Sequence, residues 1–194
     1  MWSDFGTIME GDTPVTEGLI TMTTTIPVGE KIFFVALNVD HNASTIEGVR
    51  IEGKDMIVEQ PTITIRGDIA TLVAAQCHLT QIDVTGAPHL TTLYLQENEL
   101  TELDLSQSAL LESVILAHNK LQTIHWTAMP NMTALFIYDN KLTSVDLTGM
   151  SQLTTLHIYN NQIGANAMEQ IANALPQRNP EDQANFMAID TQNA

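Results

Sequence analysis

The chain has 194 residues, of which 44% are apolar and only 5% are aromatic. This length suffices for one compact domain or one elongated repeat domain, and aliphatic side chains must build its core. Seven basic residues against 23 acidic ones give a formal net charge of −16, which disfavours nucleic acid and anionic membrane surfaces as partners.

The first residues, 1–14, contain neither the basic nor the apolar segment of a signal peptide. We expect them to form a flexible leader. No apolar stretch anywhere in the chain approaches the ~20 residues of a membrane-spanning helix. Direct insertion into a membrane is therefore not expected.

Residues 15–68 alternate apolar and polar side chains in three short runs, around Ile20, Ile32 and Ile63. Alternation of this kind is typical of half-buried strands. We therefore expect a β-rich N-terminal cap over this range. The segment 46–56 also fits the repeat pattern described next, with a lysine in place of the expected asparagine. A degenerate extra coil is the alternative there.

Residues 69–163 contain five copies of the pattern Leu-x-x-Leu-x-Leu-x-x-Asn-x-Leu, each 21 residues after the last. Apolar residues two positions apart, such as Leu93 and Leu95, point to one face of a short strand. A single coil has no partner for this face, whereas stacked coils bury it against each other. The repeat predicts a mainly β solenoid of five coils with one parallel, concave sheet. The copies begin at Ile69, Leu90, Leu111, Met132 and Leu153.

The ninth position of the pattern forms a column through the stacked coils. A sharp turn follows each strand, and a buried peptide group left unpaired there costs about 1–3 kcal/mol. An asparagine amide offers donors and an acceptor, so we expect it to bridge the turns of adjacent coils. Cys77, the only cysteine, is expected to be a small buried thiol, with a reactive thiol as the alternative. The column consists of Cys77, Asn98, Asn119, Asn140 and Asn161.

The second half of each coil also repeats, as LTQIDVT, LTELDLS, LQTIHWT and LTSVDLT. Its alternation predicts a short extended segment on the opposite, convex side. Asp83, Asp104 and Asp146 share one column there, with His125 in the gap. We expect these acids to cap turns or face solvent. A cation shared by Asp83 and Asp104 is the alternative, because adjacent coils lie about 4.8 Å apart.

Residues 164–194 lose the repeat and are expected to close the C-terminal end of the core. Asn166, with Glu169 three residues later, resembles a helix N-cap with its reciprocal partner. An amphipathic helix is predicted by the spacing of Met168, Ile171, Ala172 and Leu175. A last strand from Phe186 to Ile189 then completes a helix–strand cap.

The coils between residues 62 and 163 resemble the 21-residue repeats of bacterial surface leucine-rich-repeat proteins of the internalin-J-like group. Members of that group often read L-x-x-L-x-C/L-x-x-N-x-L-T-x-L-D-V-S, and LTTLYLQENELTELDLS is similar to this consensus. The resemblance implies a right-handed leucine-rich-repeat solenoid that is secreted or held on the bacterial cell surface and takes part in adhesion. The chain departs from the group in showing no signal segment or sorting domain.

The outward positions of the predicted concave sheet hold an unusual share of the aromatic residues. Exposed rings on a rigid sheet suit protein hot spots or stacking on sugars. Packing of the rings along their own columns, which would stiffen the sheet, is the alternative. The predicted ligand-binding patch comprises Tyr94, Gln96, Phe136, Tyr138, His157 and Tyr159. Its polar margin comprises Glu97, His118, Asp139 and Asn160.

No catalytic motif is recognisable in the sequence. No histidine pair has the i, i+4 spacing of a metal motif, and no phosphate-binding loop or nucleophile elbow occurs. We therefore expect no enzymatic activity, no cofactor and no metal. The predicted function is noncovalent recognition of a protein or carbohydrate by the concave sheet. The alternative is a structural spacer or accessory module of a larger surface protein, with no tight ligand of its own.

Overall fold

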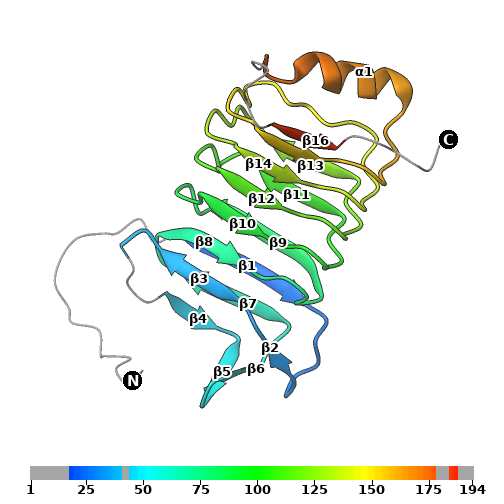
Figure 1. The fold of residues 1–194 in the computed structure, drawn as a ribbon. Helices are drawn as coiled ribbons and strands as arrows, with labels where there is room; N and C mark the ends of the chain where they lie inside the picture. Colours follow the sequence, from blue (N-terminus) through cyan, green and yellow to red (C-terminus); the bar gives the residue numbers. More distant parts are fainter. Residues whose placement is uncertain (1–17, 41–43, 178–183, 188–194) are drawn as a thin grey trace.

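The structure is a computed structural model that describes residues 18–40, 44–177 and 184–187. Its described part is mostly β with a single helix, and successive coils stack as a solenoid (Figure 1). The strands before the repeats are β1 (Leu19–Thr24), β2 (Lys31–Ile32), β3 (Val35–Asn38), β4 (Thr45–Glu47), β5 (Val49–Glu52), β6 (Asp55–Val58) and β7 (Thr62–Arg66). The repeat strands are β8 (Ile69–Val73), β9 (Leu79–Gly86), β10 (Thr92–Tyr94), β11 (Glu102–Leu105), β12 (Ser113–Ile115), β13 (Thr123–Trp126), β14 (Ala134–Phe136) and β15 (Thr155–His157). The chain continues with α1 (Ala165–Ala174) and β16 (Asn185–Met187).

A seven-stranded sheet in the order β16-β15-β14-β12-β10-β8-β3 runs along the solenoid. Its repeat strands pair in parallel and in register, so that Leu72 lies beside Leu93 and Leu93 beside Val114. The sheet is the predicted concave side, and its outward surface is called the sheet face below. β16 extends it in parallel at one end, and β3 adds an antiparallel edge strand at the other.

Aliphatic side chains of successive coils stack in the interior. Burial of one such side chain contributes roughly 1.5–3 kcal/mol, and each coil supplies the neighbour that the next coil needs. The equivalent inward residues of the five repeat strands in this sheet are at most 1% exposed: Leu72, Leu93, Val114, Leu135 and Leu156.

Asparagine side chains connect the turns of adjacent coils. The Oδ1 of Asn119 accepts a hydrogen bond from the N–H of Leu100 at 3.0 Å. Its Nδ2 donates to the carbonyls of Leu95 in the preceding coil, at 2.8 Å, and Leu116 in its own coil, at 3.1 Å. The same pattern recurs at Asn98, Asn140 and Asn161. These four buried side chains form the asparagine row, which pairs peptide groups that the turns would otherwise leave without partners.

Cys77 occupies the first position of this column and is 1% exposed. Its Sγ lies 3.1 Å from the carbonyl of Phe33 and 3.3 Å from that of Ala75. No preceding coil lies beside it, so an amide that reaches back to another turn is not required here. Burial raises the pKa of the thiol to about 11, although the contact with the Phe33 carbonyl works against this shift. The thiol is therefore buried and protonated at neutral pH.

The N-terminal strands form two antiparallel sheets. β1, β4, β7 and β9 make a sheet in the order β4-β7-β1-β9. Since β9 belongs to the first coil, the cap is joined to the solenoid by backbone hydrogen bonds between β1 and β9. Alternation in the sequence predicted β1, β7 and β9, but neither β4 nor this pairing.

Residues 46–56 form no further coil, so that alternative is wrong. β5 and β6 pair as an antiparallel hairpin, and β2 lies beside β6. An extra coil would place a parallel strand beside β8, but the antiparallel β3 takes that position. The match to the repeat pattern reflects apolar alternation, which hairpins and coils share.

The second halves of the coils form β9, β11 and β13, and β11 pairs in parallel with β13. The fourth copy, residues 142–148, forms no strand, although Leu147 is buried. The indole N–H of Trp126 in the preceding coil donates to the carbonyl of Asp146 at 2.8 Å. The predicted extended segment is therefore present in three coils and lost in the fourth. The outward side of these segments is called the back face below.

The C-terminal end of the stack is covered by α1 (Figure 1). Ile171 is 2% exposed, and Met168 packs against the core. Ala172 is exposed, contrary to the predicted inward face. The predicted cap at Asn166 is also wrong, because the helix begins after Gly164 and no side chain caps it. Asn166 therefore lies inside the first turn.

The strand predicted from Phe186 to Ile189 is present as β16 and pairs with β15. Its last two predicted residues lie outside the described part of the chain. The same holds for the leader expected over residues 1–14.

Replacing Asn119 with alanine leaves the N–H of Leu100 without its acceptor, while each carbonyl that the amide contacts keeps another donor. We expect the free energy of unfolding to fall by about 1–3 kcal/mol, because this is the cost of one buried polar group left unsatisfied. Urea titration followed by circular dichroism measures this. Asn131→Ala is the matched control, since Asn131 is exposed and its loss should change stability by less than about 0.5 kcal/mol. Equal effects of the two substitutions would refute the structural role of the row.

The thiol of Cys77 should resist Ellman's reagent at pH 8, because only the thiolate is nucleophilic. We expect modification of the folded chain to be at least about a hundredfold slower than in 6 M guanidinium chloride. The folded pKa of about 11 exceeds the ordinary value of 9.0, so the unfolded chain loses this proton first and stability declines as pH rises between these values. Cys77→Ala should remove that decline. Rapid labelling of the native protein would contradict the observed burial.

Candidate functional site

Two adjacent strands bring four rings together on the sheet face. Phe136 ends β14 and His157 ends β15, and these two residues lie side by side in the parallel register. Tyr138 and Tyr159 follow two positions later in the same two coils. We call Phe136, Tyr138, His157 and Tyr159 the aromatic patch.

The rings of the aromatic patch contact one another closely. Tyr138 and Tyr159 stack with centroids 4.6 Å apart and an interplanar angle of 14°. Phe136 and His157 meet edge to face at 4.7 Å. His118, from the preceding coil, contacts Tyr138 edge-on at 5.1 Å. Such pairs are worth about 0.5–1.5 kcal/mol beyond their buried area, so the alternative in which the rings stiffen the sheet has a geometric basis.

All four rings of the aromatic patch are partly buried. The facing surfaces of Tyr138 and Tyr159 cover each other in part, because the rings are stacked nearly parallel with centroids 4.6 Å apart. A ligand would therefore meet the outer edges of these two rings more readily than their inner faces. This geometry favours contacts with the irregular surface of a protein over flat stacking on a sugar ring.

The electrostatics of the aromatic patch follow from burial. Burial lowers the pKa of His157 below its ordinary value, so the imidazole is neutral at neutral pH. Burial also raises the pKa of Tyr159, with smaller contributions from Tyr138 and Asp139. The Nε2 of His157 is buried and has no hydrogen-bond partner among the described residues. The patch is thus uncharged and retains one unsatisfied polar atom.

Two predicted site residues lie apart from the aromatic patch. Tyr94 ends β10, which β12 separates from β14, and its hydroxyl lies 3.1 Å from the Oγ of Ser113. Gln96 follows in the same coil, and its Oε1 is buried without a partner in the described part of the chain. The structure therefore places all six predicted residues on one face but joins only four of them.

The predicted polar margin lies in the turns beside the patch. Asp139 accepts a hydrogen bond from Asn160 at 2.7 Å, and its carboxylate lies 3.2 Å from the imidazole of His118. The carboxylate of Glu97 likewise accepts a hydrogen bond from the side chain of Gln76, in the preceding turn, at 2.6 Å. Each margin residue has a left-handed backbone, with φ between 53° and 58°. Contacts between neighbouring turns thus hold the margin in place next to the rings.

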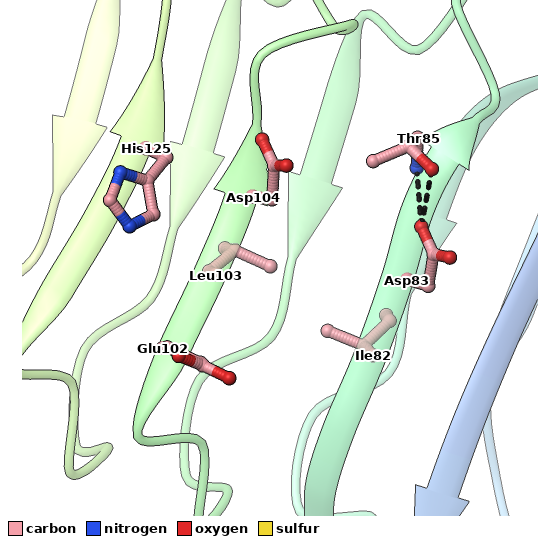
Figure 2. A pocket seen from close by; sticks show the side chains of 7 residues that line it. All are labelled: Ile82, Asp83, Thr85, Glu102, Leu103, Asp104 and His125. Carbon is pink, nitrogen blue, oxygen red and sulfur yellow. Dashed lines mark hydrogen bonds between the residues drawn. The ribbon is translucent and has the colours of Figure 1, made fainter.

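A depression of about 380 Å³ opens on the back face between β9, β11 and β13. Figure 2 shows its lining side chains, with Asp83 on β9, Asp104 on β11 and His125 on β13. Glu102 adds a third carboxylate, while Ile82 and Leu103 supply apolar atoms. The sequence predicted the aspartate column on this side but not the depression. The available signal was the combination of acids and apolar residues in segments that lack lysine and arginine.

The aspartates of the back face cap turns, as expected. Asp83 accepts hydrogen bonds from the N–H and hydroxyl of Thr85, at 2.9 and 2.6 Å (Figure 2). Asp104 accepts a hydrogen bond from the N–H of Ser106 at 2.8 Å, and Asp146 accepts one from the N–H of Thr148 at 2.9 Å. These bonds hold the pKa values of Asp104 and Asp146 below their ordinary range. Within the described residues, no three His, Cys, Asp or Glu side chains are arranged to hold a metal ion.

Three further findings bear on the kind of protein. No helix in the part of the chain that the structure describes is long and apolar enough to cross a membrane. A comparison with models of protein families gives no match. A comparison with curated proteins also finds none.

The His157 imidazole should titrate well below its ordinary pKa of 6.5, because burial penalises the charged form. Since the folded pKa is depressed, the unfolded chain takes up this proton first, and stability is lost as pH falls below about 6.5. NMR titration of the imidazole resonances measures the pKa directly. Tyr159→Ala should open the site and move the value back toward 6.5. An unshifted His157 in the native chain would be incompatible with its burial.

Proposed function

We propose that this chain is a leucine-rich-repeat solenoid that recognises a macromolecular ligand noncovalently through the aromatic patch. The single observation that carries the proposal is the convergence of four rings from two adjacent strands on an otherwise regular sheet. Aromatic side chains are enriched among the residues that dominate binding energy at interfaces. A protein ligand is favoured over a carbohydrate, because the stacked tyrosine pair offers a ligand ring edges more readily than flat faces.

The leucine-rich-repeat assignment is supported by the asparagine row and the aliphatic stack. Both occupy the positions that the 21-residue pattern assigns to them. We further propose that the protein belongs with the internalin-J-like surface proteins and acts outside the cell or on the bacterial surface. That part rests on the resemblance between residues 62–163 and the repeats of the group.

The unsatisfied polar atoms on the sheet face also support binding. Leaving a buried polar atom unpaired costs about 1–3 kcal/mol. His157 Nε2 and Gln96 Oε1 both lie on this face without partners in the described residues. A ligand that induces small side-chain movements and supplies complementary groups would recover part of that cost. A purely structural face gains nothing from keeping such atoms unpaired.

The competing function, a structural spacer, is favoured by one specific observation. The ring contacts of the aromatic patch run along the columns of the sheet, so they stabilise the stack even without a ligand. The two functions differ in what a substitution of the tyrosines does to binding.

We expect Tyr138→Ala combined with Tyr159→Ala to weaken ligand binding at least tenfold and stability by only about 1–2 kcal/mol. Binding is measured on a glycan array and a displayed-peptide library, followed by calorimetry with the best hit. Tyr94→Ala is the matched control, because Tyr94 is a half-buried tyrosine of the same face outside the patch. Loss of stability without any change in affinity would establish the spacer function instead.

A further inference from the structure

Three depressions adjoin one another along the back face. One of about 290 Å³ lies over β1, β9 and the start of β11, and one of about 240 Å³ lies over β13 and the fourth coil. The depression of Figure 2 lies between them. It shares Ile82, Asp83 and Glu102 with the first and His125 with the second. We call this row of three adjoining depressions the back groove.

The middle of the back groove lies where the strand pairing is interrupted. β9 is hydrogen-bonded to β1 on one side, and β11 is hydrogen-bonded to β13. No sheet among the described residues joins β9 to β11. Backbone groups at the two facing edges are therefore not used by a ladder, and the surface is hollowed between them (Figure 2).

The chemistry of the back groove is acidic with an apolar base. Its carboxylates are Asp83, Glu102, Asp104 and Asp146. The apolar lining comes from Ile82, Leu103, Ile124, Trp126 and Val145. The back-face segments 79–88, 100–109, 121–130 and 142–151 contain no lysine or arginine. His125 is the only basic side chain within these segments, so they carry a net negative charge.

The aspartates of the groove are already fixed in place. The two bonds to Asp83 both use Oδ1, which leaves Oδ2 outside them. Because the capping bonds order the side chains before a ligand arrives, binding a cationic group costs little further side-chain entropy. An arrangement of this kind serves a charged partner better than a set of freely rotating surface acids.

We propose that the back groove binds an extended, basic segment of a partner protein. Lysine or arginine side chains at alternate positions of the segment lie with their aliphatic stems over the partly exposed Ile82 and their charges beside Asp83 and Asp104. The face of Trp126 suits a guanidinium group at one end. The groove crosses four strand spacings of about 4.8 Å, which matches about six extended residues. This interaction does not depend on the aromatic patch, which lies on the sheet face.

The probe for this proposal is the peptide acetyl-Lys-Thr-Lys-Thr-Lys-Thr-amide, compared with its Glu-Thr counterpart. Amide chemical shifts of the full chain are followed by NMR during titration. We expect the lysine peptide to shift amides of β9, β11 and β13, and the glutamate peptide to shift none of them. In a Trp2→Phe background, fluorescence of Trp126, then the only tryptophan, should also change.

Asp83→Asn with Asp104→Asn is the decisive variant. Asparagine retains the side-chain oxygen that caps each turn, so the fold is kept while two charges are removed. We expect the dissociation constant to rise at least fivefold. Glu112→Gln with Glu169→Gln is the control, because it removes the same charge at exposed positions outside the groove and should change the constant less than twofold. Equal losses in both variants, shifts confined to the sheet face, or no binding by the lysine peptide would overturn the proposal.

Discussion

Hydrogen bonds from buried asparagine side chains determine how this molecule is assembled. Each amide pairs a backbone donor of the preceding coil and carbonyls of two coils, so it fixes the distance and the rotation between them. Hydrophobic burial drives the coils together but is not directional. The asparagine row supplies the direction, and the parallel register of the sheet strands follows from it.

Register in turn places the chemistry of the surface. Because β14 and β15 pair without a shift, residues 21 apart become neighbours, and the tyrosines of two coils stack as one unit. On the back face the same periodicity aligns aspartates that cap equivalent turns. The solenoid therefore carries two unlike surfaces on one scaffold: an uncharged aromatic patch and an acidic groove. Neither surface requires a loop insertion, because stacking places equivalent positions of adjacent coils side by side.

The caps modify the solenoid where the repeat alone would leave it open. At one end β1 pairs with β9 and draws the first coil into the cap sheet, and the pairing between β9 and β11 is absent. The interruption under the back groove lies directly beside this connection. At the other end α1 covers the last coil with Ile171, while most of its remaining surface faces solvent.

The sequence by itself determined the solenoid, the inward residues and the asparagine row, because a strict 21-residue period leaves one arrangement in which every apolar face is buried. It also determined that Phe136 and His157 would be neighbours. It did not determine the fate of residues 46–56, since alternation is the same in a hairpin and in a coil. Only the tertiary structure decided that Tyr94 stands apart, that the stacked tyrosines cover each other's faces, and that a groove opens beside β9. Those outcomes depend on the pairing of strands distant in sequence, such as β1 with β9, and no local pattern encodes such a pairing.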